Sequence, residues 1–368
     1  MAYAQKKMRN GVERWYARYL GDDGKYHVEG GFTSEREALK VAHQREEEAR
    51  RGEWVDPRNA RMTFERFVDQ HYWPTTANLE VSTRAAYRAI INKHFLPAFG
   101  ALAMRRVSPT VVQAWVNNPT STLKPRTVVK YHALLHKIFA RAVVERVVPV
   151  NPCAHTELPK VVVKRRRIIT PSEFDVLVQS LDSRYLTLVL VGIESGLRWG
   201  ELVALRPVDI DFATSTIRVH RTLAEVSKKD SPTGERIFAK DYPKDDEERP
   251  VQIEGSTCAL IKRHMLERGV RAEDLLFTST RGTALSRNNF RTKTWLPALK
   301  AADLGHHVTF HDLRAAHASW LLAGGADLQV VKERLGHSQI TTTQQYLGTL
   351  PDAGDKALAA FRRTRAGH

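Results

Sequence analysis

The chain contains few cysteines and no long apolar run. Its 368 residues include only two cysteines, Cys153 and Cys258, and no CxxC pair. A structural zinc site is therefore not expected, and a reduced, cytoplasmic setting fits. No apolar run approaches the ~18 residues of a transmembrane helix, and the first residues lack the apolar core of a signal peptide. We therefore expect no membrane span and a location in the cytoplasm.

Acidic residues are too few to balance the basic ones. Lys and Arg number 57 against 41 Asp and Glu, which gives a net charge of +16. Residues 62–165 hold 15 basic and 5 acidic residues, a net +10, whereas 1–61 has +2 and 166–368 has +4. This excess favours a nucleic-acid partner, with an anionic membrane surface as the alternative. If the partner is DNA, residues 62–165 should contact much of its phosphate backbone.

Metal ligands are also sparse. No Asp/Glu cluster has metal-ligand spacing, and the run Asp245–Glu248 is typical of a solvated loop. We therefore expect neither a metal nor a cofactor. The length predicts two or three domains, because single cores stop growing near ~250 residues.

The first 55 residues predict a small α+β domain, a three-stranded sheet plus a helix. Strands are expected at 12–20 and 26–32, joined by the turn Gly21-Asp-Asp-Gly24. Ser34 precedes Glu37 in capping-box spacing, so a helix should follow, through about Arg51. On the first strand, Arg14 and Arg18 could read a DNA groove, although basic and aromatic strand residues are more often packing or surface.

Residues 62–155 predict a helical domain after a linker at 56–61. Four helices are expected, which begin near Thr63 (ending at Pro74), Ser82, Ser108-Pro109 and Pro125. The last is the longest and carries a basic set that lies largely off its apolar stripe: Arg126, Lys130, Lys137 and Arg141. These residues could form a solvated face or contact DNA, and the charge of the segment makes the two readings about equal.

Residues 156–169 form a second, basic linker before the last domain. Its Lys164, Arg165, Arg166 and Arg167 could lie along a DNA groove or form a flexible tether. Thr170-Pro-Ser-Glu173 then begins a helix of a mainly α domain, 170–368. Strands at Thr216–His220 and Arg249–Ile253 predict a small antiparallel sheet with a long polar connection, Lys228 to Glu248. Helices should resume at Cys258.

Five residues of this last domain suit an attack on a phosphodiester. They are Arg198, His311, Arg314, His337 and Tyr346. Two arginines can bind two oxygens of a pentacoordinate phosphorane, and a tyrosine phosphate ester conserves the energy of the broken bond. Histidines can exchange protons near neutral pH. Each residue alone has a structural explanation, as a surface charge, a helix cap or a core aromatic, but their combination on one chain is harder to explain that way.

The chain resembles the tyrosine recombinase (phage integrase) family. Three motifs carry the resemblance: Gly196-Leu-Arg-Trp-Gly-Glu-Leu202, His311-Asp-Leu-Arg-Ala-Ala-His-Ala318 and Leu335-Gly-His-Ser-Gln-Ile-Thr-Thr-Thr-Gln-Gln-Tyr346. The likeness is strong over about 170–350 and weaker over 62–155. It rests only on general layout for 1–55. It implies an arm-type DNA-binding domain, a helical core-binding domain and a mixed, mainly α catalytic domain, in that order.

The resemblance also implies a role for each site residue. Arg198 and Arg314 would grip the scissile phosphate, and His337 would hydrogen-bond a non-bridging oxygen. His311 would assist phosphate binding and proton transfer to or from Tyr346, which would form a 3′-phosphotyrosyl intermediate. Glu201 would orient the site. A hairpin lysine would protonate the leaving 5′ oxygen. The candidate is Lys244, with Lys240 in reserve, because an acidic run follows Lys244 where small and basic residues are more usual.

The family further implies a homotetramer on two double-stranded DNA duplexes. Strands would be exchanged in pairs through a Holliday junction at core-type sites, with arm-type sites bound separately. The C-terminal segment Ala357–Arg363 would form a short helix that packs on a neighbouring subunit or in cis. A host DNA-bending protein and an excisionase are implied accessories, and the task would be integration of phage or mobile-element DNA into a bacterial chromosome. The alternatives are a Xer-type resolvase, a type IB topoisomerase and a non-enzymatic DNA-binding regulator.

Overall fold

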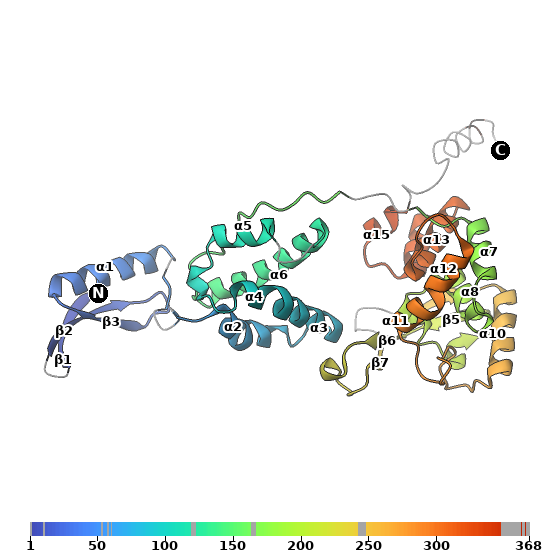
Figure 1. Ribbon diagram of the computed structural model, residues 1–368, viewed down its shortest axis with the longest axis horizontal. Helices are drawn as coiled ribbons and strands as arrows, with labels where there is room; N and C mark the ends of the chain where they lie inside the picture. The colour runs from blue at the N-terminus through green and yellow to red at the C-terminus, as the bar shows by residue number, and fades with distance from the viewer. Residues whose placement is uncertain are drawn as a thin grey trace. The chain divides into compact units, whose positions relative to one another are not determined.

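The computed structural model describes residues 2–9, 12–52, 54–56, 59, 61–118, 123–162, 167–241, 248–346, 362 and 365. The chain divides into two compact units, Met1–Val163 and Lys164–His368. Figure 1 shows that both are rich in helices and that the sheets are small. The multi-domain, mainly α fold with small β-sheets is therefore confirmed.

The N-terminal unit begins with an antiparallel sheet covered by one helix. Its elements are β1 (Tyr3–Arg9), β2 (Val12–Leu20), β3 (Tyr26–Phe32) and α1 (Glu35–Arg50), with strand order β1-β2-β3. Alternate residues of β2, Ala17 and Tyr19, are buried with Ala38 and Ala42 of α1. The Ser34 side chain accepts a hydrogen bond from the Glu37 N–H at 3.2 Å, as the capping pattern predicted. β1 had not been located from the sequence.

The rest of the N-terminal unit is helical. Its helices are α2 (Phe64–Phe67), α3 (Val81–Ile90), α4 (Leu96–Phe99), α5 (Pro109–Asn117) and α6 (Pro125–Val144). Short π-helical turns, Val68–Tyr72 and Ile91–Phe95, extend α2 and join α3 to α4. Edge and tilted contacts among Phe64, Phe95, Phe99 and Phe139 form the centre of the core.

Two helix boundaries in this unit differ from the prediction. Pro74 does not end the first helix, because the helical chain continues past Tyr72 as a 3₁₀ segment, Trp73–Thr76, with Pro74 in its first turn. Ser82 is not an N-cap, because it lies inside α3, whose N-cap is Glu80. The starts at Ser108 and Pro125 are confirmed.

The C-terminal unit packs helices around two small sheets. The helices are α7 (Pro171–Gln179), α8 (Leu186–Ser195), α9 (Trp199–Leu202), α10 (Gly255–Arg268), α11 (Arg287–Phe290), α12 (Leu296–Ala302), α13 (Phe310–Ala323), α14 (Leu328–Leu335) and α15 (Ile340–Gln344). The strands are β4 (Ile210–Asp211), β5 (Thr216–Val219), β6 (Arg221–Glu225), β7 (Ile237–Asp241) and β8 (Arg249–Gln252), in the orders β4-β5-β8 and β6-β7.

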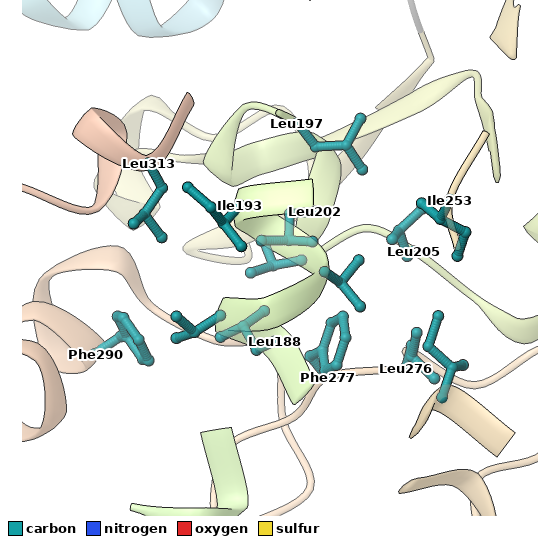
Figure 2. Packing of buried hydrophobic residues seen from close by; sticks show 14 of the residues in the cluster. Leu188, Ile193, Leu197, Leu202, Leu205, Ile253, Leu276, Phe277, Phe290 and Leu313 are labelled. Atoms are coloured by element: carbon teal, nitrogen blue, oxygen red, sulfur yellow. The ribbon is translucent and has the colours of Figure 1, made fainter. Parts of the chain in front are cut away.

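The core of this unit is built around α8. Figure 2 shows Leu188 and Ile193 of this helix among buried residues from α9, α13 and the segment near Leu276, among them Leu202 and Leu313. α8 has few polar residues, and an apolar helix of this kind is buried on most sides. Because Arg198 follows this helix by three residues, the packing of α8 positions the start of the candidate site.

Four further predictions concern this unit. The expected connection from Lys228 to Glu248 is wrong in part, because β7 forms within it and pairs with β6. The helix expected at Cys258 begins earlier, at Gly255. Apart from Arg362, the predicted C-terminal helix at 357–363 lies outside the described residues. The strand positions of β5 and β8 are confirmed.

Candidate active site

Arg198 lies in a tight turn between two helices. α8 ends at Gly196, whose φ of 63° is in the left-handed region that glycine adopts readily. A Cβ on Gly196 would lie 2.5 Å from the His317 ring, so the packing also requires a glycine. Arg198 then caps α9, and its backbone N–H donates to Glu201 Oε2 at 2.9 Å. The local sequence therefore places this arginine at the start of a helix, with 41% of its side chain exposed.

Arg314 is almost fully buried, which is rare for an arginine. It lies in the first turns of α13 and uses both ends of its guanidinium: Nη1 donates to the Gly196 carbonyl at 2.7 Å and Nη2 to the Leu335 carbonyl at 2.5 Å. Burial, followed by the nearby charge of Arg198, lowers the pKa of Arg314 to about 10. The side chain therefore remains charged at neutral pH and is fixed in orientation.

Three consecutive backbone carbonyls at the end of α14 accept hydrogen bonds from arginines. The carbonyls of Arg334, Leu335 and Gly336 accept, in that order, from Arg249 Nε (3.2 Å), Arg314 Nη2 (2.5 Å) and Arg198 Nη2 (2.8 Å). We call these carbonyls the carbonyl triplet. Carbonyls at a helix C-terminus lack partners within the helix and carry partial negative charge, so cations suit them. One turn of chain thus orients three guanidinium groups.

A buried carboxylate, Glu201, joins two of these arginines. Its Oε1 accepts from Arg198 Nη1 at 2.8 Å and its Oε2 from Arg249 Nη2 at 2.5 Å. The Glu201 side chain has no exposed surface, so it needs such charged partners to remain ionised. One carboxylate between Arg198 and Arg249, with Arg314 beside them, leaves the cluster positive and suited to a phosphate.

Arg249 was missed by the sequence reasoning. It opens β8, and its contact with Glu201 joins residues 48 positions apart. Its local signal was only a basic residue at the start of a predicted strand. No spacing rule pairs such a residue with a helix-capping glutamate, so the contact could be found only in the folded structure.

His337 and Tyr346 lie beside each other beyond α14. His337 Nδ1 is hydrogen-bonded to Thr343 Oγ1 at 2.9 Å, and its ring stacks on the Tyr346 ring with centroids 6.3 Å apart. Burial, followed by the charges of Arg314 and Arg198, lowers the pKa of His337 to about 4. The ring is therefore neutral at pH 7. In the tautomer that accepts from Thr343, its Nε2–H is left to donate to a substrate oxygen.

His311 and Arg314 share α13 but differ in exposure. His311 is exposed at the start of the helix, whereas Arg314 is buried one turn later. The charge of His311 contributes to the lowered pKa of His337. The structure thus gathers all five residues of the predicted constellation around the end of α14 and the start of α13.

The predicted general acid, Lys244, lies outside the described residues. The reserve candidate, Lys240, lies on β7 in register with Thr222 of β6. A Cβ on Gly200 of α9 would overlap the Thr222 side chain and lie 2.8 Å from the Leu223 carbonyl oxygen. The β6–β7 hairpin therefore packs directly against the short helix that Arg198 caps.

The candidate DNA-binding residues on the first sheet lie on one face. Arg14 and Arg18 alternate with the buried Ala17 and Tyr19 on β2, so they point away from α1. The guanidinium of Arg18 lies 5.2 Å from the centre of the Tyr26 ring and contacts a second tyrosine, Tyr3, at 5.6 Å. Both arginines are only half-buried, so this face combines basic and aromatic groups.

On α6, the basic candidates divide into two kinds. Arg126, Lys130 and Lys137 are exposed, at spacings that place them on one side of the helix. Arg141 instead pairs with Glu145, four residues later. In the basic linker, Arg167 pairs with Glu173 of α7 at 2.5 Å, and the other three candidates, Lys164, Arg165 and Arg166, lie outside the described residues.

Two kinds of feature are absent from the described residues. In that part of the chain, no three His, Cys, Asp or Glu side chains gather as metal ligands would. Among the same residues, no helix is long and apolar enough to cross a membrane.

Comparison with known proteins agrees with the site. The family model described as the phage integrase family matches residues 167–351, which is half of the chain, and the phage integrase N-terminal SAM-like domain matches residues 63–119. The chain belongs to the phage integrase family. It is therefore a tyrosine recombinase, as the three motifs implied.

Two curated relatives illustrate the range of the likeness. The integrase of Mycobacterium phage D29 is 28% identical over 311 residues, covering 80% of this chain and 78% of that protein. The tyrosine recombinase XerC of Roseiflexus sp. (strain RS-1) is 30% identical over 292 residues, covering 73% and 84%. Both phage integrases and Xer recombinases are thus relatives.

Among solved structures, a lambda integrase tetramer bound to a Holliday junction is similar to this chain. The TM-score is 0.60 at 20% identity, over 93% of this chain and 94% of that one. At this identity the likeness concerns the fold, and it extends over nearly the whole chain.

Proposed function

We propose that this chain is a site-specific recombinase that cuts and rejoins double-stranded DNA through a 3′-phosphotyrosyl intermediate. The observation that carries the proposal is the carbonyl triplet. It orients Arg198 and Arg314 in front of one turn, and the same turn leads directly to His337. An array of fixed guanidiniums is suited to the equatorial oxygens of a phosphorane, and it needs no reorganisation as charge develops.

Each step of the proposed reaction is assigned to a residue. The Tyr346 hydroxyl attacks the scissile phosphorus and gives up its proton to His311. The bond from phosphorus to the 5′ oxygen breaks, and Lys244 supplies a proton to that oxygen. Arg198, Arg314 and the Nε2–H of His337 hold the non-bridging oxygens. A 5′ hydroxyl from a second strand then reverses the attack and releases the tyrosine, so no cofactor and no net bond energy are consumed.

The organisation of the chain follows the same proposal. Residues 1–55 would bind arm-type sites, through a face that includes Arg14 and Arg18. Residues 62–155 and 170–368 would bind the core-type site and catalyse, joined by the segments 56–61 and 156–169. The net +10 of residues 62–165 supports this division, because the catalytic segment alone is only modestly basic. The enzyme would act on DNA in the bacterial cytoplasm.

The assembly we propose is a homotetramer that passes through a Holliday junction. The tetrameric lambda integrase structure, similar in fold, supports it. The task would be the integration of phage or mobile-element DNA into a bacterial chromosome, and the mycobacteriophage integrase relatives support this reading. A host DNA-bending protein and an excisionase would act as accessories.

A Xer-type resolvase is the second candidate, favoured by the 30% identity to a XerC. Such a resolvase would not need the sheet-and-helix domain at 1–55. Deleting residues 1–55 separates the two functions. An integrase should lose arm-site binding and integration while still cleaving core sites, whereas a Xer-type enzyme should recombine at its normal rate.

The proposal is tested with two duplexes that carry the flanking DNA of the gene as core sites. Purified protein should yield recombinant products with strands from both duplexes, and denaturation should trap protein joined to a 3′ phosphate. Relaxation of supercoils without exchange would indicate a topoisomerase instead. Binding without any covalent product would indicate a regulator, and either result would contradict the proposal.

A further inference from the structure

We propose that Arg249 is a positioning residue for this reaction. It would act through Glu201 and the carbonyl triplet, and would hold the Arg198 guanidinium and the turn before His337 in the geometry that cleavage needs. The inference rests on the proposed function, because it concerns the same site. Arg249 was not among the five residues predicted from the sequence, so this role is new to the site.

Two hydrogen bonds tie Arg249 to the site. Its Nη2 donates to Glu201 Oε2 at 2.5 Å, and its Nε donates to the Arg334 carbonyl at 3.2 Å. The other carboxylate oxygen of Glu201 accepts from Arg198. Arg249 therefore helps to fix the carboxylate, and the carboxylate, together with the Gly336 carbonyl, holds the Arg198 guanidinium.

Arg249 also supports the turn that carries His337. A Cβ on Gly336 would lie 3.0 Å from Arg249 Nη1 and 3.2 Å from its Cδ, so the arginine side chain packs closely against that glycine. Gly336 is the residue whose carbonyl accepts from Arg198, and His337 follows it. The Arg249 side chain thus contacts both Glu201 and the end of α14.

Exposure separates the positioning arginine from the one that would bind DNA. The Arg198 side chain is 41% exposed, whereas Arg249 is 13% exposed and Glu201 is fully buried. Arg198 is therefore the more accessible of the two arginines, although both line one cavity with His337. The three are ordered as a supporting arginine, a shared carboxylate and a phosphate-binding arginine.

Replacement of Arg249 should loosen the geometry of the site. Without Arg249, the buried Glu201 keeps the backbone N–H and the side chain of Arg198 as donors, but Oε2 loses its guanidinium donor. The guanidinium of Arg198 would then sample other positions relative to the phosphate. A misplacement of about 1 Å can slow a reaction about 100-fold. DNA affinity, which depends on many phosphate contacts, should change little.

The test uses the full-length protein and a nicked suicide substrate that traps the covalent product. Arg249→Gln should slow adduct formation by roughly 10- to 100-fold while the DNA dissociation constant stays within about twofold. The matched control is Arg263→Gln, which removes an exposed ion pair of α10 with Glu267 and should leave the rate unchanged. An Arg249→Gln protein that cleaves at the wild-type rate would overturn the proposal.

Two further variants distinguish positioning from other roles. In a Glu201→Gln background, adding Arg249→Gln should slow cleavage little further, because both act through one carboxylate. Multiplicative losses would mean that Arg249 contacts DNA directly. Arg249→Lys keeps the charge but can satisfy only one of the two acceptors, so it should be intermediate. Full activity of Arg249→Lys would mean that charge alone matters.

Stability and the proposed function are checked in the same experiment. If the loss in Arg249→Gln merely followed a lower Tm and disappeared on cooling, the role would be structural and the proposal would fail. The wild-type protein reports separately on the recombinase assignment. No wild-type adduct would count against the proposed function, whereas a wild-type adduct with unchanged variants would count against Arg249 alone.

Discussion

The active-site arginines and the basic residues of α6 are built in opposite ways. Arg314 is buried, and both ends of its guanidinium donate to backbone carbonyls. On α6, Arg126 and Lys130 are exposed on a helix face. Both regions carry positive side chains. Only Arg314 and its neighbours in the candidate site are held in one orientation by hydrogen bonds. We propose that the C-terminal unit uses arginine for geometry and that α6 uses basic residues for attraction to DNA.

The positive charges of Arg198, Arg249 and Arg314 lie close together, and the surrounding groups offset their mutual repulsion. Like charges at close range should repel, and the pKa of Arg314 is lowered to about 10 by burial and by Arg198. The carbonyl triplet and Glu201 offset this repulsion. The exposed residues of α6 need no such support, because water and salt screen them.

The largest effect should come from a change that keeps charge but alters geometry. Arg314→Lys cannot donate to both the Gly196 and Leu335 carbonyls, so we expect covalent adduct formation to fall by about 100- to 1,000-fold, comparable to removing one preorganised donor. The rate is measured under single-turnover conditions. Arg126→Lys on α6 makes the same exchange on an exposed face and should change the rate less than twofold. A similar loss of adduct formation in Arg314→Lys and Arg126→Lys would contradict the proposed difference between the two regions.

A smaller effect is expected from acid, through the buried histidines. Burial and then Arg334 lower the pKa of His317 to about 3, and that of His337 is about 4, against about 6.5 when unfolded. The unfolded chain therefore binds these protons first. The stabilisation is complete above pH 6.5 and is lost as the pH falls toward 4, by at most about 1.4 kcal/mol per pH unit for each group.

This acid dependence is measured as the Tm between pH 7.5 and 4.5. His317→Gln removes one titrating group, so its Tm should fall less steeply with acid than that of the wild type. His307→Gln, which removes an exposed histidine, is the control and should leave the slope unchanged. Parallel slopes in wild type and His317→Gln would contradict the assignment of His317 as a buried neutral ring.

The smallest effect should come from single charges on α6. Lys130→Ala should weaken DNA binding by a few-fold and reduce the slope of log affinity against log salt by about 1, as expected for one phosphate contact. The cleavage rate of bound DNA should not change. Binding titrations at several salt concentrations measure the slope. An unchanged slope would favour the solvated-face reading of this helix.

The sequence predicted the parts of the fold that depend on local chemistry. The caps at Ser34, Ser108 and Thr170 were found because a capping side chain and its N–H partner lie within three residues. The prediction for Ser82 was wrong: a serine near a helix start is a common cap, but the N-cap of this helix lies two residues earlier, at Glu80. The hairpin of β6 and β7 was not predicted because β7 has only five residues and lies within a mainly polar stretch of the sequence.

The site was predictable as a set of residues and not as an arrangement. Motif spacing identified Arg198, Arg314 and Tyr346, because each lies in a recognisable local context. The carbonyl triplet could not be identified from spacing. Every residue has a backbone carbonyl, so the sequence does not show which carbonyls accept hydrogen bonds from arginines. The triplet's donors Arg314, Arg249 and Arg198 lie 21, 85 and 138 residues from their acceptors along the chain.

The most direct measurement compares wild type with Tyr346→Phe on a labelled suicide substrate. The phenylalanine ring retains the packing against His337 and Leu335 but has no hydroxyl. We expect this variant to bind DNA with wild-type affinity and to form no denaturation-resistant adduct, whereas the wild type forms one. A covalent adduct formed by Tyr346→Phe would contradict the central claim that this hydroxyl attacks the phosphate.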